Sequence, residues 1–183
     1  MLAGAEAAAK VWAARPAKER SEIIHRVGIG LSENRAQLME IAAAECGKAL
    51  DGGDIEVSEA VDFCHYYAQQ CLELEQQAGA KFQPARVTVS TPPWNFPIAI
   101  PTGSTVSALA AGSSVIFKPA KEAARTGALL AKIMWEAGVP REVLHFVQLG
   151  NRDLGKNLMA DKRVDRVILT GSIDTAKMFR SWD

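Results

Sequence analysis

An asparagine in a rigid, largely apolar turn is the first group in this sequence that could do chemistry. Asn95 lies in the run Pro93-Trp94-Asn95-Phe96-Pro97, whose prolines restrict the backbone. Its carboxamide can donate two hydrogen bonds without carrying charge, which suits stabilisation of a developing oxyanion. It could equally satisfy backbone groups of its own turn, as asparagines in turns commonly do. The residues alone do not decide between these two roles.

Three further segments carry groups that could bind an anion or a nucleotide. Gly171 and Ser172 precede a predicted helix, whose N-terminus could attract a pyrophosphate or could simply be capped by the hydroxyl. Gly155 could contact a cofactor or pack against a neighbouring helix, and Lys118-Pro119 alone is more typical of the end of a strand. No G-x-G-x-x-G motif follows the first predicted strand, so a nucleotide would be held differently from the usual dinucleotide fingerprint.

The cysteines and histidines predict neither a disulfide framework nor a metal site. Cys46, Cys64 and Cys71 are odd in number and contain no Cys-x-x-Cys spacing, so we expect reduced thiols. Cys64 and Cys71 are seven residues apart and share one helix face, where small buried hydrophobes are expected. The histidines are scattered singly without ligand spacing, at His25, His65 and His145.

Composition argues against several classes of partner. The 183 residues are 48% hydrophobic and 23% charged, as in a globular protein of one or two domains. Lys and Arg total 21, as do Asp and Glu, so the formal net charge is zero and gives no general attraction to nucleic acid or anionic lipid. No apolar stretch is long enough to span a bilayer, and no secretory signal is visible. We therefore expect a cytoplasmic protein with no nucleic-acid partner and no membrane span.

The first 80 or so residues predict helices. An amphipathic stripe from Ile23 to Leu31 predicts one helix, and Ser32 is expected to cap the next. The Gly52-Gly53 pair is expected to interrupt the helical pattern before a long helix begins. No extended polar linker follows. We therefore expect residues 1–80 to form a helical layer packed on the remainder of the chain.

After Lys81 the pattern changes to strands that alternate with helices, which is typical of βαβ units. This predicts an α/β fold with a Rossmann-like parallel sheet, flanking helices and right-handed crossovers over residues 81–183. The predicted strands are 87–90, 115–117, 143–147 and 164–169, and the predicted helices are 102–111, 123–137, 153–159 and one after Ser172.

The candidate residues follow the ends of these strands. The Asn95 turn follows the first strand, Lys118 the second, Gly150 the third and Gly171-Ser172 the fourth. Ligands of an open parallel sheet bind beyond the carboxyl ends of its strands. Topology alone therefore predicts that these groups gather above one edge of the sheet.

A series of motifs in this order resembles the aldehyde dehydrogenase superfamily. The match covers almost the whole chain, and the joint order and spacing are far more specific than any one motif. The motifs are Pro93-Trp94-Asn95-Phe96-Pro97, Ala108-Leu109-Ala110-Ala111-Gly112, Lys118-Pro119, Glu136-Ala137-Gly138-Val139-Pro140 and Thr170-Gly171-Ser172, with Trp12 to Arg20, Glu45-Cys46-Gly47-Lys48 and the Glu56 to Ala68 helix upstream.

The resemblance implies an enzyme that oxidises an aldehyde with NAD, or NADP, through a cysteine thiohemiacetal and a thioester that water hydrolyses. It implies that Asn95 is the side-chain oxyanion donor, that Trp94 lines the passage of cofactor and substrate, and that Pro93 takes part in cofactor binding. The other residues that it assigns to cofactor binding are Lys118 at the adenosine ribose, Gly171 and Ser172 at the pyrophosphate, Gly155 near the adenine, and Ala120 and Lys121 in the turn after Lys118.

Within the superfamily, the runs Glu56 to Ala68 and Trp94 to Ile100 are similar to the glutamate semialdehyde (1-pyrroline-5-carboxylate) dehydrogenases. This similarity implies oxidation of L-glutamate γ-semialdehyde to glutamate in proline catabolism. It also implies a homo-oligomeric parent, which in some members is fused to a proline dehydrogenase module. The alternatives are a dehydrogenase for another aldehyde and a non-catalytic interaction module that kept the nucleotide fold.

Two departures from the family pattern alter these expectations. The chain stops at Asp183, and the family's catalytic cysteine and general-base glutamate lie further downstream. We therefore expect an incomplete aldehyde dehydrogenase fold, with a partial dinucleotide-binding domain at 81–183, no catalytic domain and no dehydrogenase activity from this polypeptide alone. Lys121 stands where NAD-preferring relatives usually carry a glutamate that accepts hydrogen bonds from the ribose; a cation there could pair with a 2′-phosphate and raise tolerance of NADP.

Overall fold

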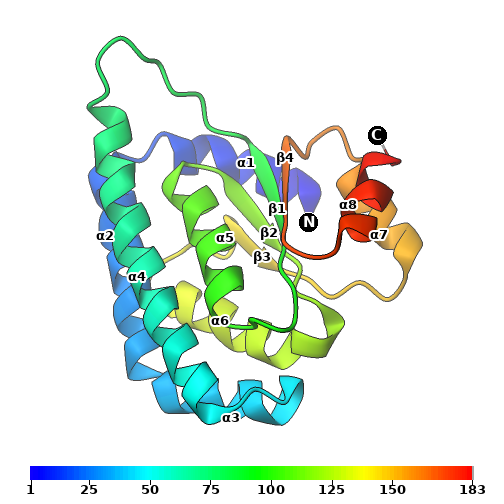
Figure 1. The fold of residues 1–183 in the computed structure, drawn as a ribbon. Helices are drawn as coiled ribbons and strands as arrows, with labels where there is room; N and C mark the ends of the chain where they lie inside the picture. The colour runs from blue at the N-terminus through cyan, green and yellow to red at the C-terminus, as the bar shows by residue number, and fades with distance from the viewer. Residues whose placement is uncertain (183) are drawn as a thin grey trace.

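A four-stranded parallel sheet lies at the centre of the computed structural model, which describes residues 1–182 (Figure 1). The strand order is β3-β2-β1-β4, and each neighbouring pair is parallel. The predicted parallel α/β sheet is therefore confirmed. The strands are β1 (Val87–Thr91), β2 (Ser114–Phe117), β3 (Leu144–Phe146) and β4 (Arg166–Leu169).

Four helices precede the sheet, and four more, with one 3-10 turn, connect or follow its strands. The preceding helices are α1 (Leu2–Ala13), α2 (Ala17–Glu33), α3 (Arg35–Cys46) and α4 (Leu50–Glu75). The later elements are α5 (Ala99–Ala110), η1 (Lys121–Ala123), α6 (Ala124–Glu136), α7 (Arg152–Met159) and α8 (Ile173–Arg180). Among the helices of residues 1–182, none combines the length and apolar character that crossing a bilayer requires.

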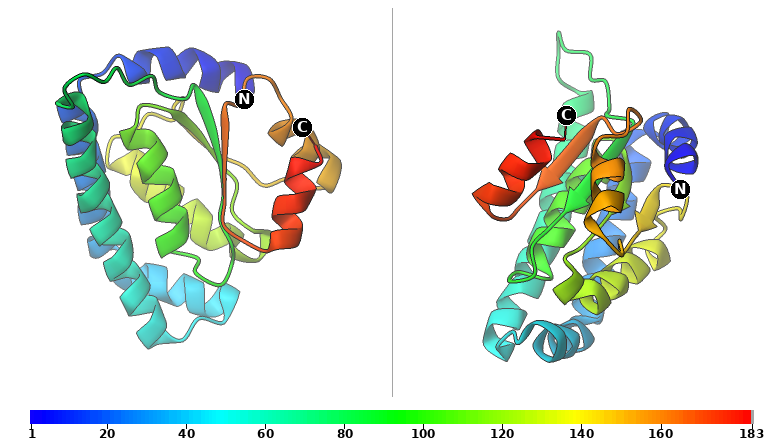
Figure 2. Two further views of the ribbon diagram at one scale, coloured as in Figure 1. Left: turned by 45° about the horizontal axis from the view of Figure 1, so that its top comes forward. Right: turned by 90° about the vertical axis from the view of Figure 1, so that its right-hand side faces the viewer.

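Helices cover both faces of the sheet because its strands alternate their apolar side chains. Val115 and Phe117 of β2 join a core with α5 and α6, behind which α2 and α4 pack. Ile116, between them, joins a second core with Ala5 of α1 and Leu158 of α7. Figure 2 shows the long α2 and α4 pair on one side of the molecule and α7 and α8 on the other.

Two local expectations for the helical layer are wrong. Gly52 and Gly53 lie inside α4, where the weak helix propensity of glycine is offset by close contact with α3; a Cβ on Gly53 would lie 3.5 Å from Cγ of Met39. Ser32 lies within α2 rather than at the start of α3. Asn34 occupies that N-cap position instead, and its side chain donates to the Gly30 carbonyl at the end of α2 (2.8 Å).

Candidate functional site

The carboxyl ends of the strands bring the predicted polar turns to one edge of the sheet, here called the rim. The ladder continues one residue past the strands, with Lys118 N donating to Ser90 O (2.9 Å) and Thr170 N to Thr91 O (3.4 Å). The turns after β1, β2 and β4 therefore leave three adjacent strands at the same level. The chain goes from β1 toward β2 through α5, whereas β4 pairs with the opposite side of β1. Such a change of direction is where ligands bind in open α/β sheets.

The Asn95 turn presents its side chains to solvent at this rim. Trp94 is 51% exposed and Phe96 is 44% exposed, and Asn95 between them is also exposed. Pro93, before them, is partly buried and Pro97, after them, is buried, so both ends of the turn are anchored. Within the part of the chain that the structure describes, the Asn95 carboxamide has no hydrogen-bond partner, whereas its carbonyl oxygen has one. The side chain is thus not used to satisfy its own turn.

An ion pair between partly buried Lys48 and buried Glu56 holds the backbone of this turn. Lys48 Nζ donates to the Asn95 carbonyl oxygen (3.1 Å) and lies 4.1 Å from the centre of the Phe96 ring, a position in which a cation is attracted by the ring face. The same ammonium pairs with Glu56, whose side chain is 1% exposed. Lys48 therefore links the turn to the start of the long helix α4.

Glu56 also fixes the helix that follows the turn. Its Oε2 accepts hydrogen bonds from Ile98 N (2.9 Å) and Ala99 N (3.1 Å) at the start of α5. A carboxylate there satisfies free N–H groups and interacts favourably with the helix dipole. One buried carboxylate thus anchors Lys48 and α5 together, on either side of Asn95.

Lys118 lies partly buried at the end of β2. Burial lowers the pKa of its ammonium, and nearby Glu122 partly opposes that shift. No carboxylate among residues 1–182 forms an ion pair with it. A partly desolvated, unpaired ammonium suits hydrogen bonds to ligand hydroxyl groups.

Close contacts with the helical layer position the turn that contains Lys118. A Cβ on Gly127 of α6 would lie 2.6 Å from Cγ of Pro119, so only glycine permits this approach. Glu45 of α3 accepts hydrogen bonds from Arg125 N and Thr126 N, both at 2.8 Å, in the first turn of α6. The helical layer therefore supplies a carboxylate to α6 as it does to α5.

Ala120 and Lys121 come next along the same turn. Ala120 is partly buried. The Lys121 side chain is 88% exposed and its Nζ lies 3.8 Å from Oε1 of neighbouring Glu122. This exposed pair leaves the ammonium accessible to a ligand.

Gly171 and Ser172 form the turn between β4 and α8. Ser172 is the N-cap of α8, and its Oγ accepts a hydrogen bond from Thr175 N (3.2 Å). The capping role considered from the sequence is therefore present. The N–H groups of Ile173 and Asp174 at the helix start remain available to bind an anion. The Asp174 carboxylate in the same first turn repels an anion there.

Gly155 lies in the second turn of α7, after the chain leaves β3. A Cβ built on it meets no atom within 4 Å. The glycine is therefore not required for contact between helices, and open space lies beside its backbone. Of the two roles that the sequence allowed, helix packing is not realised.

The cysteines lack the surroundings of an activated nucleophile. Burial raises the pKa of Cys64 to about 12 and also raises that of Cys71. Cys46, at the end of α3, has a raised pKa because of burial and the negative charge of Glu45. Its thiol donates to the Glu122 carbonyl oxygen (3.3 Å).

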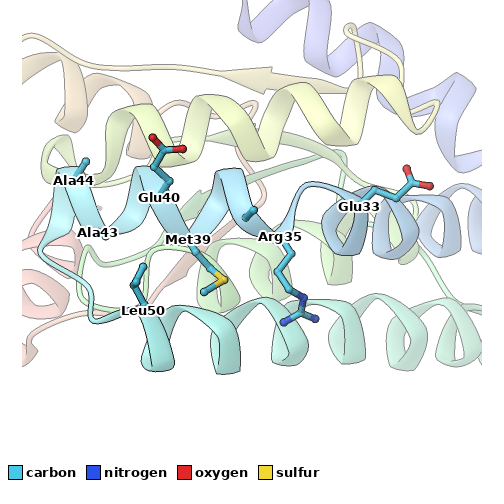
Figure 3. A pocket seen from close by; sticks show the side chains of 8 residues that line it. Glu33, Arg35, Met39, Glu40, Ala43, Ala44 and Leu50 are labelled. Carbon is cyan, nitrogen blue, oxygen red and sulfur yellow. The ribbon is translucent and has the colours of Figure 1, made fainter.

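A hollow of the surface lies outside this site. It has a volume of about 790 Å³ and extends along α3 to the start of α4 (Figure 3). The Met39 and Leu50 side chains extend into the space between these helices. Its lining contains none of the residues predicted from the sequence: Glu33, Arg35, Ala36, Met39, Glu40, Ala43, Ala44 and Leu50.

Register places the turns of Asn95, Lys118 and Gly171 at one rim, and Gly155 lies a helical turn into α7. The residues that hold these turns, Glu45, Lys48 and Glu56, were part of the sequence motifs but had no role assigned from the sequence. The backbone groups of the turn, of α5 and of α6 that they bond lie between 42 and 81 residues away along the chain, so no local spacing could reveal these contacts. A glutamate on the buried stripe of a helix is the one local signal, because an unpaired carboxylate is rarely buried.

Comparison with known proteins identifies the family. The family model described as the aldehyde dehydrogenase family matches residues 1–181. The bifunctional protein PutA of Escherichia coli (strain K12) is 39% identical over 172 residues, covering 94% of this chain and 13% of that protein. The 1-pyrroline-5-carboxylate dehydrogenase of Staphylococcus epidermidis is 33% identical over 171 residues, with 88% and 33% covered. The α-ketoglutarate semialdehyde dehydrogenase of Haloferax volcanii is 34% identical over 184 residues, with 95% and 38% covered.

Solved structures agree. Proline utilization A (PutA) from Corynebacterium freiburgense superposes with a TM-score of 0.89 at 35% identity, covering 97% of this chain and 19% of that one. A point mutant of Thermus thermophilus 1-pyrroline-5-carboxylate dehydrogenase superposes with a TM-score of 0.93 at 29% identity, covering 99% of this chain and 37% of that one. The chain thus spans well under half the length of these relatives. It belongs to the aldehyde dehydrogenase family.

Proposed function

We propose that this chain is the cofactor-binding and oxyanion-binding portion of an NAD(P)-dependent aldehyde dehydrogenase that oxidises L-glutamate γ-semialdehyde to glutamate. The observation that carries the proposal is the shared rim, where a carboxamide and an ammonium that have no side-chain partner among residues 1–182, and a helix N-terminus, follow three adjacent strands. Family membership supports the reaction class. The named 1-pyrroline-5-carboxylate dehydrogenases among its relatives support the substrate.

The residues at the rim fit a dinucleotide. Lys118 would donate hydrogen bonds to the adenosine ribose, and the Gly171-Ser172 turn would hold the pyrophosphate at the start of α8. Gly155 would leave room for the adenine, because no atom occupies the position of its missing side chain. Pro93, Trp94 and Ala120 would line the same passage. The bound nicotinamide supplies the acceptor for the hydride that leaves the aldehyde carbon.

Asn95 would stabilise the transition state for attack on the aldehyde. As a nucleophile adds to the carbonyl, negative charge develops on the carbonyl oxygen, and the carboxamide can donate N–H to it. Lys48 and Glu56 keep this donor in place through the backbone, so that little reorganisation is needed during reaction. The exposed Trp94 and Phe96 rings on either side would exclude water from the reacting groups.

The polypeptide of 183 residues is proposed to lack turnover by itself. None of its cysteines has the surroundings of an activated thiolate, so the nucleophile must come from elsewhere in the whole protein. The test is to mix the purified chain with glutamate semialdehyde and NAD and to record the absorbance of reduced cofactor. Sustained turnover would overturn this part of the proposal.

The complete reading frame that contains this chain tests the substrate. Its steady-state kcat/KM is expected to be highest for glutamate semialdehyde in a panel that includes α-ketoglutarate semialdehyde. The second aldehyde is a real competitor, because a dehydrogenase with that name is 34% identical to the chain. No turnover with any aldehyde would favour a non-catalytic interaction module instead.

The choice of cofactor is the next part of the proposal. The accessible Lys121 ammonium would pair with a 2′-phosphate, so NADP is expected to be accepted beside NAD.

The organisation of the whole protein is the last part. The similarity to bifunctional PutA proteins supports a proline dehydrogenase module in the same parent. Residues 1–80 would then be the helical region and residues 81–183 the first part of the dinucleotide-binding domain.

A further inference from the structure

Two histidines from different helices face each other on the outer side of the helical layer. His25 of α2 and His65 of α4 have their Nδ1 atoms 2.9 Å apart, and their ring centroids are 5.0 Å apart with an interplanar angle of 50°. Both residues are exposed. They are 40 residues apart along the chain, so sequence spacing does not reveal the pair.

The separation of the two ring nitrogens fits ligands of one metal ion. Imidazole nitrogens bind first-row divalent metals at about 2.0–2.1 Å. Two such ligands at a right angle lie about 2.9 Å apart, whereas a tetrahedral angle places them about 3.4 Å apart. The observed spacing is that of a hydrogen bond between the two rings, and after a small rotation of the rings both nitrogens could occupy adjacent positions of a tetragonal site, the geometry of Cu(II) and Ni(II) with nitrogen and oxygen ligands.

We propose that His25 and His65 form a binding site for Cu²⁺ or Ni²⁺, with both Nδ1 atoms as ligands and water in the remaining positions. Within residues 1–182, no group of three or more His, Cys, Asp or Glu side chains surrounds an ion position, so the protein supplies two ligands. Each ring binds in its neutral form with the proton on Nε2. The ion replaces the hydrogen bond that otherwise joins the two Nδ1 atoms.

The helices hold the pair in this geometry before any ion arrives. α2 and α4 run antiparallel, since Ala17 at the start of α2 contacts Cys71 near the end of α4, and Gly28, later in α2, lies beside Cys64, earlier in α4. Beside the histidines, a Cβ on Gly28 would lie 3.1 Å from Cβ of Cys64. Because the two backbones are already this close, the helices need not move together when an ion binds. A bound ion would join α2 to α4.

The charges near the pair favour a cation. Glu22 and Asp62 each precede a histidine by three residues and so share its helix face. Both are exposed. The neighbouring Arg26, whose Nε donates to the Ala137 carbonyl oxygen (2.9 Å) at the end of α6, adds one positive charge against these two carboxylates.

Titration of the chain with metal tests the site without reference to catalysis. The chain is purified without a histidine tag, with Cys46→Ser to remove the partly exposed thiol. Isothermal titration with NiCl₂ is expected to show one ion per chain, and the melting temperature is expected to rise with Ni²⁺ concentration because the ion binds the folded state. Cu²⁺ should give an electron spin echo spectrum with two coordinated imidazoles.

The variants separate this site from other metal ligands. His25→Gln and His65→Gln should each weaken Ni²⁺ binding by about tenfold or more and abolish the rise in melting temperature, with unchanged circular dichroism. His145→Gln, the remaining histidine, is the matched control and should bind as the parent does. Absence of binding at submillimolar Ni²⁺, binding that survives both substitutions, or a spectrum with a single imidazole would each overturn the proposal.

Discussion

The Asn95 carboxamide has no hydrogen-bond partner among residues 1–182, while Lys48 holds the backbone of its turn. In the complete enzyme, Asn95→Ala is expected to lower kcat by about 10²–10³-fold, the usual effect of losing one oxyanion donor. The KM for the aldehyde should change little, because the bond strengthens only as charge develops. Steady-state rates of cofactor reduction measure both quantities.

Asn157→Ala provides the control for this substitution. Asn157 is also exposed but lies on α7, so its removal should leave kcat unchanged. A variant at Asn95 that raises KM and keeps kcat would assign the side chain to substrate binding rather than to transition-state stabilisation.

The ion pair between Lys48 and Glu56 is expected to contribute far more to the free energy of unfolding than an exposed pair does. Lys48→Met leaves the Glu56 carboxylate buried without its cation and should lower the free energy of unfolding by about 3–5 kcal/mol. Adding Glu56→Gln should restore part of that loss, because the charge that lacked a partner is gone. Urea denaturation of the chain measures each variant.

Lys132→Met is the matched control for the ion pair. It breaks an exposed pair with Glu136, whose side chain is 62% exposed, and should change stability by at most about 0.5 kcal/mol. Equal effects of the two lysine substitutions would show that the pair at the turn is not energetically buried.

Residue chemistry could be predicted from the sequence only as a choice between roles. Asn95 in its proline-bounded turn could satisfy its own backbone or face a ligand, and the exposed, unpartnered side chain favours the second role. The role of Glu56 as an anchor could not be derived in this way, because it bonds Ile98 and Ala99, 42 and 43 residues further on. Long-range polar partners leave no periodic trace.

At the scale of elements, the helical layer acts as a support for the rim. Glu45 caps α6 and Glu56 caps α5, and these are the helices that follow the turns of Lys118 and Asn95. The element types were predictable from apolar periodicity. The start of α4 was not, because its two glycines have poor helix propensity and the contact of Gly53 with Met39 of α3 leaves no local signal in the sequence.

Gly127 tests how closely α6 must approach the turn of Lys118. Gly127→Ala places a methyl group 2.6 Å from Cγ of Pro119, and the proline ring cannot rotate away. The substitution should destabilise the chain by about 1–3 kcal/mol, as overpacking does. Gly4→Ala, where no atom lies within 4 Å, should be neutral or stabilising by up to about 1 kcal/mol; thermal unfolding that shifts equally in both would contradict the contact.

A substitution at Gly155 distinguishes an effect on cofactor binding from an effect on the stability of α7. Gly155→Ala meets no protein atom and should stabilise α7 by up to about 1 kcal/mol. If the adenine lies against this backbone, the added methyl group should weaken NAD binding by about tenfold or more. Calorimetric titration of the complete protein measures the affinity, and unchanged binding would place the adenine elsewhere.

At the scale of the whole molecule, the alternation of strands and helices was sufficient to predict a parallel sheet. The order β3-β2-β1-β4 was not predicted, because short strands such as Leu144–Phe146 carry no signal of their neighbours. The common rim depends only on parallel pairing and not on the order. Parallel pairing leaves the turns after β1, β2 and β4 at one edge of the sheet, although the arrangement of the strands was unknown.

One exposed arginine joins the two ends of the fold at the opposite edge of the sheet. Arg86, just before β1, bonds Glu6 of α1 (2.6 Å) and Asp165 just before β4 (2.7 Å). Hydrogen bonding to Arg86 lowers the pKa of Asp165. A carboxyl group with a lower pKa in the folded state stabilises the fold above its unfolded-state pKa of about 4 and loses that contribution as the pH falls further.

Asp165→Asn should therefore be less stable than the parent chain at pH 7, and the difference should shrink as the pH falls below about 4. The Arg86 pair is solvent-accessible, so the difference should also shrink in high salt. Urea denaturation from pH 7 to pH 3 measures both effects. Asp62→Asn, which removes an exposed aspartate with no ion pair among residues 1–182, is the control and should parallel the parent. A gap between Asp165→Asn and the parent that stays constant with pH would show that Arg86 joins β4 to α1 through its backbone contacts rather than through charge.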